Sequence, residues 1–109
     1  MSKIAIRDMN SSYMRQMDML LEEELEHLKT WNPKGFDWAA FYTCLLRIKR
    51  RNEDKVQITD KASKKYTFSL DVVDAFVMRD YFQTHALPST KHPYLDYVYN
   101  QLLEQIDRI

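Results

Sequence analysis

Apolar residues recur every three or four positions over four long stretches of the chain. These stretches run from Tyr13 to Lys29, from Trp38 to Arg51, from Val72 to Thr84 and from Pro93 to Ile109. Such spacing gathers the apolar side chains on one face, which is typical of amphipathic helices that pack on a core. The pattern therefore predicts four helices.

Two shorter stretches alternate apolar and polar residues with a period of two, as β-strands do. They are Lys55 to Thr59 and Tyr66 to Leu70, and the residues between them include no glycine. We expect an antiparallel hairpin closed by a loop rather than by a tight turn. Ile4 and Ile6 give a weaker alternation, and this segment is expected to join the hairpin as a third strand. The predicted fold is α+β: about four helices packed with a small antiparallel β-hairpin, in the order αα-ββ-αα.

The bulk composition is that of a small globular protein. A chain of 109 residues can bury a core of its own, so we expect a single domain over residues 1–109. No apolar run approaches the roughly 18 residues of a membrane span, and residues 1–20 contain no apolar signal core. The single cysteine, Cys44, fits a reducing compartment. We expect a cytoplasmic protein with no membrane contact.

The net charge is zero, but the charges are unevenly distributed. Residues 18–29 carry five acidic and one basic side chain, whereas residues 47–65 carry eight basic and three acidic ones. Local fields of this kind govern association more than the total charge does. The acidic face of the first long helix is interpreted either as a solvated surface or as a docking surface for a basic partner. One such partner is the 47–65 region of a second copy.

The basic middle of the chain is the sharpest candidate for a nucleic-acid interface. Its cations lie at the end of the second predicted helix and in the predicted hairpin: Arg47, Lys49, Arg50, Arg51, Lys55, Lys61, Lys64 and Lys65. Such side chains neutralise the phosphates of DNA or RNA. A helix followed by a basic two-stranded wing resembles the end of a winged-helix module, over about residues 37–70. The alternative is structural, because cations in the last turn of a helix also complement its dipole.

A protein partner is the competing interpretation. Four of the six methionines fall in one short segment near the N-terminus. Methionine adapts to irregular surfaces and is common at interfaces. Two of the four belong to the apolar stripe of the first helix, whereas Met9 and Met19 flank it. Tyr94 and Tyr97 of the last helix are further candidates, because tyrosine is enriched at interface hot spots. The alternative function is therefore a protein-binding adaptor or inhibitor, and the alternative for these residues is ordinary packing.

Motifs for metal binding and catalysis are weak. The three histidines and Cys44 lack the spacing of a zinc site, and the only glycine, Gly35, cannot form a phosphate-binding loop. Glu24 and His27 form one Glu-x-x-His unit, but a di-iron site needs a second such unit and two more glutamates. We predict a non-enzymatic regulatory protein without metal or cofactor. Its leading function is contact with DNA or RNA phosphates, and it is expected to act as a homodimer.

Overall fold

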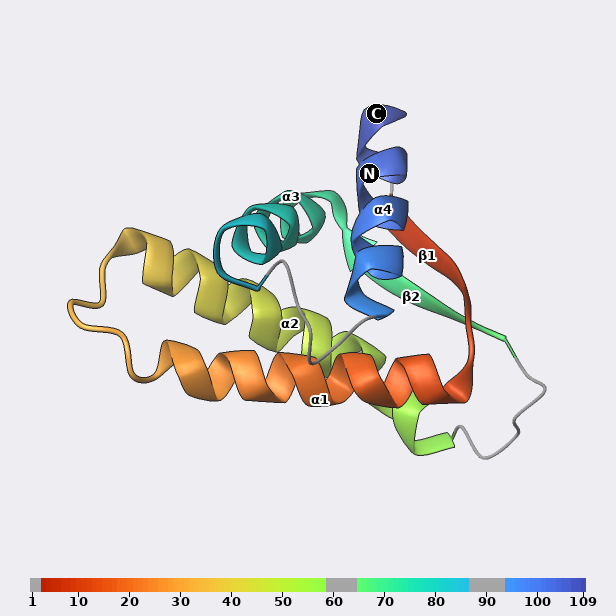
Figure 1. Ribbon diagram of the computed structural model, residues 1–109, viewed down its shortest axis with the longest axis horizontal. Helices are drawn as coiled ribbons and strands as arrows, with labels where there is room; N and C mark the ends of the chain where they lie inside the picture. Colours follow the sequence, from red (N-terminus) through yellow and green to blue (C-terminus); the bar gives the residue numbers. More distant parts are fainter. Residues whose placement is uncertain (1–2, 59–64, 87–93) are drawn as a thin grey trace.

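Over residues 3–58, 65–86 and 94–109, which the computed structural model describes, the chain forms two strands, four α-helices and a short π-helical segment (Figure 1). The elements are β1 (Lys3–Met9), α1 (Ser11–Leu28), α2 (Phe36–Ile58), β2 (Tyr66–Asp71), α3 (Val72–Tyr81), the π-helical segment (Phe82–Ala86) and α4 (Tyr94–Asp107). The predicted α+β class with four helices is confirmed.

The helices α1 and α2 form an antiparallel pair along the molecule. Figure 1 shows their connecting loop at one end of the molecule and the strands at the other. α1 begins after Asn10, whose side-chain oxygen accepts a hydrogen bond from the N–H of Tyr13 at 2.7 Å and so caps the helix. The buried face of α1 consists of residues spaced by one helical turn: Met14, Met17, Leu20, Leu21, Leu25 and Leu28. The predicted stripe therefore packs against the rest of the core.

The strands β1 and β2 pair antiparallel into a two-stranded sheet. Ile4 lies opposite Leu70 and Ile6 opposite Phe68, and all four side chains are buried. The register shifts after Ile6, where Asp8 has a positive φ of 61°. This is a β-bulge. Because of its extra residue, the next side chain that faces the core is that of residue 9 instead of residue 8.

The predicted hairpin is wrong in its first arm. α2 continues to Ile58, so the segment from Lys55 to Ile58 is helical, and β2 pairs with the N-terminal strand instead. The order of elements is consequently β-αα-β-αα, and no two-stranded wing follows α2 in the described residues. The alternation from Lys55 to Ile58 covers so few residues that it also fits a helix. Extending α2 through these residues is favourable because a helix that already exists needs no new nucleus.

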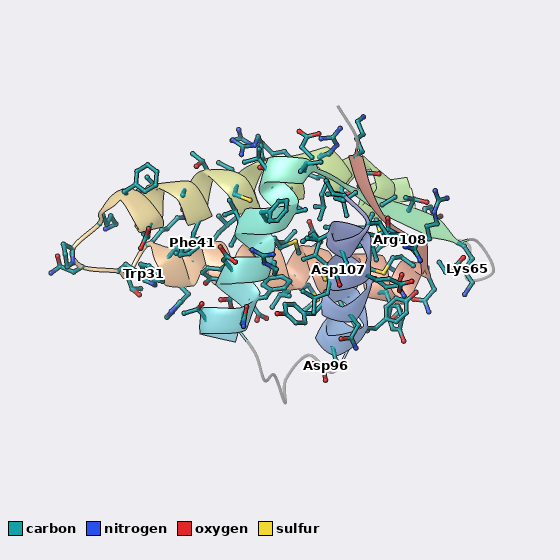
Figure 2. All side chains as sticks on the ribbon, turned by 90° about the horizontal axis from the view of Figure 1, so that it is seen from above. Trp31, Phe41, Lys65, Asp96, Asp107 and Arg108 are labelled. Carbon is teal, nitrogen blue, oxygen red and sulfur yellow. The ribbon has the colours of Figure 1, made fainter. Side chains whose placement is uncertain are left out.

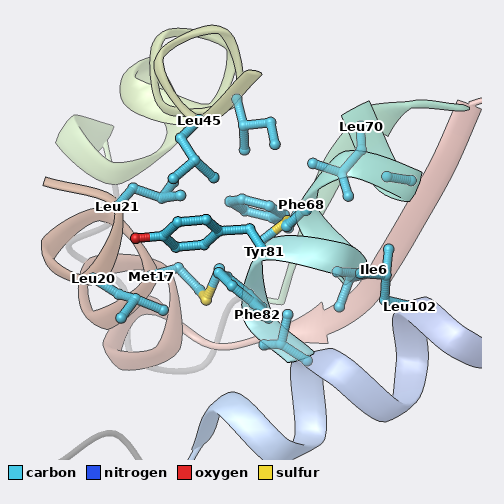
Figure 3. Close-up of a cluster of buried hydrophobic side chains, with 14 of the residues drawn as sticks. Ile6, Met17, Leu20, Leu21, Leu45, Phe68, Leu70, Tyr81, Phe82 and Leu102 are labelled. Atoms are coloured by element: carbon cyan, nitrogen blue, oxygen red, sulfur yellow. The ribbon is translucent and has the colours of Figure 1, made fainter. Parts of the chain in front are cut away.

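The core forms where α3 packs on α1, α2 and the sheet. Tyr81 and Phe82 are fully buried, and Figure 3 shows the Tyr81 ring near Leu45 of α2 and Phe68 of β2. The Tyr81 hydroxyl donates a hydrogen bond to Glu24 Oε1 of α1 at 2.5 Å. This bond satisfies the polar end of a buried ring and joins α3 to α1.

Candidate partner-binding surface

Arg47, the first cation of the predicted nucleic-acid cluster, binds α3. Its Nε donates to Oδ2 of Asp74 at 3.2 Å, and its Nη2 donates to Oδ1 of the same carboxylate. Asp74 is only 4% exposed. Hydrogen bonding to this carboxylate raises the pKa of Arg47 further above its ordinary value. The guanidinium therefore compensates a buried charge inside the molecule.

Two more cations of the cluster form ion pairs between elements. Lys49 Nζ lies 3.3 Å from Oδ1 of Asp18 in α1, and Arg51 Nη1 lies 2.7 Å from Oδ1 of Asp71 at the end of β2. Each pair is partly exposed and contributes at most about 1 kcal/mol. Arg47, Lys49 and Arg51 are therefore paired with acids of the same chain, which weakens the support for these three residues as phosphate ligands.

Two of the remaining members of the cluster have described side chains. Arg50 and Lys65 are exposed and make no ion pair within the described residues. Figure 2 shows Lys65 at the opposite end of the molecule from Trp31. The side chains of Lys55, Lys61 and Lys64 lie outside the described part of the chain. Contact of this cluster with nucleic acid stays a prediction, and the internal ion pairs of three of its cations weaken it.

Some of the predicted partner-binding residues are likewise engaged inside the molecule. Met9 is fully buried, so its assignment to a partner surface is wrong, and the bulge at Asp8 is the reason. Tyr97 is engaged within the molecule, because its hydroxyl donates to the carbonyl of Arg7 at 3.1 Å. The side chain of Tyr94 lies outside the described part. Met19, in contrast, is 55% exposed, one of the few large apolar side chains left open to solvent among the described residues.

Met19 lies among carboxylates on the outer side of α1. With Glu22, Glu23 and Glu26 it lines a hollow of about 360 Å³. Positions 19, 22, 23 and 26 are separated by three, four and seven residues, so they share one face of the helix. We call this surface the Met19 face (Met19, Glu22, Glu23 and Glu26). It joins one apolar anchor to three acids.

The Met19 face continues into a groove between α1 and α2. Glu22 and Glu26 also line a second hollow of about 260 Å³, with Leu25, Tyr42, Leu46, Lys29, Lys49, Arg50 and Glu53. The groove therefore has apolar side chains between two charged rims. Lys29 Nζ lies 2.9 Å from Glu26 Oε1, which raises the pKa of Lys29. Arg50, predicted to bind phosphate, instead lies beside these glutamates.

Comparison with known proteins gives no family for this fold. No family model, curated protein or solved structure matches the chain. The function is therefore argued from its own residues.

The described residues give no support to metal or thiol chemistry. No three histidine, cysteine or acidic side chains gather among them to hold a metal ion, and none of their helices is long and apolar enough to cross a membrane. Cys44 is buried, and its Sγ lies 3.4 Å from the carbonyl oxygen of Asp74. Burial, with a smaller contribution from Asp74, raises the pKa of the thiol to about 12. A thiol that stays protonated and inaccessible is a poor nucleophile.

Sequence reasoning missed the acid partners of the cluster. Asp74, Asp18 and Asp71 stand 27, 31 and 20 residues from Arg47, Lys49 and Arg51 in the chain. The one available signal was Asp74 within an apolar helical pattern, because a charge on a buried face requires a partner. The glutamates of the Met19 face were visible in the charge pattern. Met19 was visible as a methionine that flanks the apolar stripe of the first helix.

Proposed function

We propose that this chain is a small, non-enzymatic binding protein whose Met19 face docks a basic amphipathic segment of another protein. The observation that carries this proposal is the exposed Met19 beside three glutamates in one hollow. The rival interface has lost three of its cations to internal ion pairs, which favours the protein-binding alternative. A cytoplasmic, regulatory role and a homodimer belong to the same proposal.

The chemistry of the Met19 face fits a helix that is apolar on one side and basic at its edges. Helical partners dock by placing apolar anchors three, four and seven residues apart into a complementary surface. Methionine adapts to such anchors because its side chain is flexible and polarisable. Lysines or arginines beside the anchors would meet Glu22, Glu23 and Glu26. Complementary charge of this kind speeds association and selects against acidic partners.

Two glutamates of α1 repel each other along the helix, and one of them has no internal cation within the part of the chain that the structure describes. Glu22 and Glu26 are a like-charge pair four residues apart, and α1 has no acidic residue in its first turn, where the dipole favours one. Glu22 makes no ion pair among the described residues. Such local conflicts are expected at functional sites, and a cationic partner would relieve this one.

The proposal is tested with a synthetic leucine–lysine peptide of helical spacing and with a scrambled peptide of the same composition. We expect the amphipathic peptide to shift amide resonances of α1 and α2 in NMR spectra, with affinity that falls as salt rises. Changing Glu22 and Glu26 together to glutamine should weaken binding about tenfold, and Met19→Ala about fivefold. Glu104→Gln, a neutralised glutamate exposed on α4, is the matched control and should bind like the wild type.

Two results would overturn this function. Equal affinity of the Glu22→Gln, Glu26→Gln double variant and the wild type would remove the Met19 face from binding. Steeply salt-dependent binding to random duplex DNA, lost on changing Arg50 and Lys65 to alanine, would support phosphate contact instead. Sedimentation velocity of the same samples measures the proposed homodimer separately.

A further inference from the structure

A third hollow lies beyond the C-terminal end of α1, where the chain turns into α2. Its volume is about 340 Å³. We call it the aromatic tip pocket and define it by its lining residues: Trp31, Pro33, Gly35, Phe36, Asp37 and Trp38. Figure 2 shows Trp31 at this end of the molecule. The pocket shares no residue with the Met19 face, so it requires an explanation of its own.

Internal contacts hold the two tryptophans of this pocket. Trp38 Nε1 donates to the carbonyl of Leu28 at 2.6 Å, and its ring stacks on Tyr42 with centroids 5.1 Å apart and an angle of 16°. Trp31 packs edge-on against Phe41, with centroids 6.1 Å apart and an angle of 82°. The pocket walls are therefore preformed, which lowers the entropic cost of binding.

The lining of the aromatic tip pocket selects for positive charge. Three aromatic rings and one carboxylate, Asp37, surround it, and none of its lining side chains is cationic. The indole N–H of Trp38 already donates to Leu28, so that ring has no free donor for an anion. Aromatic faces attract cations through their negative π-systems, and a carboxylate adds a full charge.

The molecule already shows this attraction with one of its own cations. Lys34 Nζ lies 5.8 Å from the centroid of the Trp38 ring, within the range of a cation–π contact. A lysine ammonium is strongly hydrated, whereas a quaternary ammonium places methyl groups against apolar walls. Phe36, 86% exposed, is an apolar surface that such methyl groups would cover.

From this geometry we infer that the aromatic tip pocket binds a quaternary ammonium group. The rings of Trp31, Phe36 and Trp38 contact its methyl groups, and the carboxylate of Asp37 offsets its charge. Lys34 is then an internal competitor, because it occupies the Trp38 ring that the ligand requires. This inference does not depend on the Met19 face.

The two tryptophans make the test direct. They are the only two in the chain and both line this pocket, so tryptophan fluorescence, excited at a wavelength that tyrosine does not absorb, reports on the pocket. The probes are tetramethylammonium and choline, compared at constant ionic strength with 3,3-dimethylbutan-1-ol, the neutral isostere of choline. We expect a saturable change in the millimolar range for the cations, and binding of the alcohol at least about threefold weaker.

Variants separate the cation site from general apolar binding. Asp37→Asn should weaken choline binding about threefold, and Lys34→Gln should strengthen it. Asp96→Asn is the matched control, because Asp37 and Asp96 are both acids in the first turn of a helix. Asp96 lies away from Trp31 in Figure 2 and should leave binding unchanged. Circular dichroism confirms that each variant is folded.

Equal responses to choline and to its neutral isostere would overturn the inference, as would the absence of any saturable change. Unchanged choline affinity in Asp37→Asn would also contradict it. Free trimethyllysine and phosphatidylcholine vesicles then show whether the ammonium group comes from a methylated side chain or from a lipid headgroup. Binding to either supports the ammonium site. None of these outcomes depends on the leucine–lysine peptide.

Discussion

Replacing Asn52 by alanine is expected to lower the free energy of unfolding by about 3 kcal/mol. Asn52 is 2% exposed in α2. Its Nδ2 donates to the carbonyl of Ile48 at 2.9 Å and to that of Ser69 at 3.3 Å, and its Oδ1 accepts from the N–H of Ser69 at 3.3 Å. One side-chain amide thus forms hydrogen bonds with both the N–H and the carbonyl of Ser69 in β2, as the main chain of a neighbouring strand would. Alanine leaves these groups without a partner in a largely dry site.

Urea unfolding followed by circular dichroism measures this loss. Ser69→Ala is the matched control, because it removes a side chain at the same contact and keeps the main-chain groups that Asn52 binds. It should cost no more than about 0.5 kcal/mol. Asn52→Leu keeps most of the volume and should cost nearly as much as alanine if hydrogen bonding decides. A loss under about 1 kcal/mol in Asn52→Ala would show that other contacts hold β2 to α2.

The helices were predictable from the sequence, whereas one boundary and the strand pairing were not. Apolar spacing gave all four helices, because a helix must bury one face whatever it packs against. α2 runs seven residues past its expected end at Arg51, to Ile58. The predicted helix therefore ends just before Asn52, the residue that joins the buried side of α2 to β2. Strand pairing joins residues far apart in the chain, and no local pattern chooses between β1 and a neighbouring hairpin arm.

The candidate surfaces were predictable only where one helix face defines them. Met19 and the glutamates beside it share a face of α1, so spacing alone groups them. Met9 was misplaced because the bulge at Asp8 shifts the alternation of β1 by one residue, a backbone feature without a strong sequence signal. The ion pairs of Arg47, Lys49 and Arg51 depend on how α2 packs against three other elements. The aromatic tip pocket likewise depends on how the loop brings Trp31 beside Trp38.

Raising the pH from 8 to 11 is expected to lower the free energy of unfolding by about 4 kcal/mol. Burial raises the pKa of Cys44 from its ordinary 9.0 to about 12. Burial, and then the hydrogen bond to Glu24, raises the pKa of Tyr81 above its ordinary 10.0. The folded state therefore holds both protons more tightly than the unfolded chain does. The stabilisation from these groups is complete below about pH 9 and is lost as the pH rises toward the folded-state values.

Urea unfolding at intervals between pH 8 and pH 11 checks this expectation, with two variants to assign it. Tyr81→Phe keeps the buried ring but removes one titrating group, so its loss above pH 10 should be shallower than that of the wild type. Cys44→Ala should flatten the loss that begins near pH 9, because the thiol is the first of the two groups to ionise in the unfolded chain. The double variant should then lose much less stability over this window than the wild type. An undiminished loss in the double variant would place the alkaline sensitivity in other groups, and Tyr81 would stabilise the core through packing and its bond to Glu24 alone.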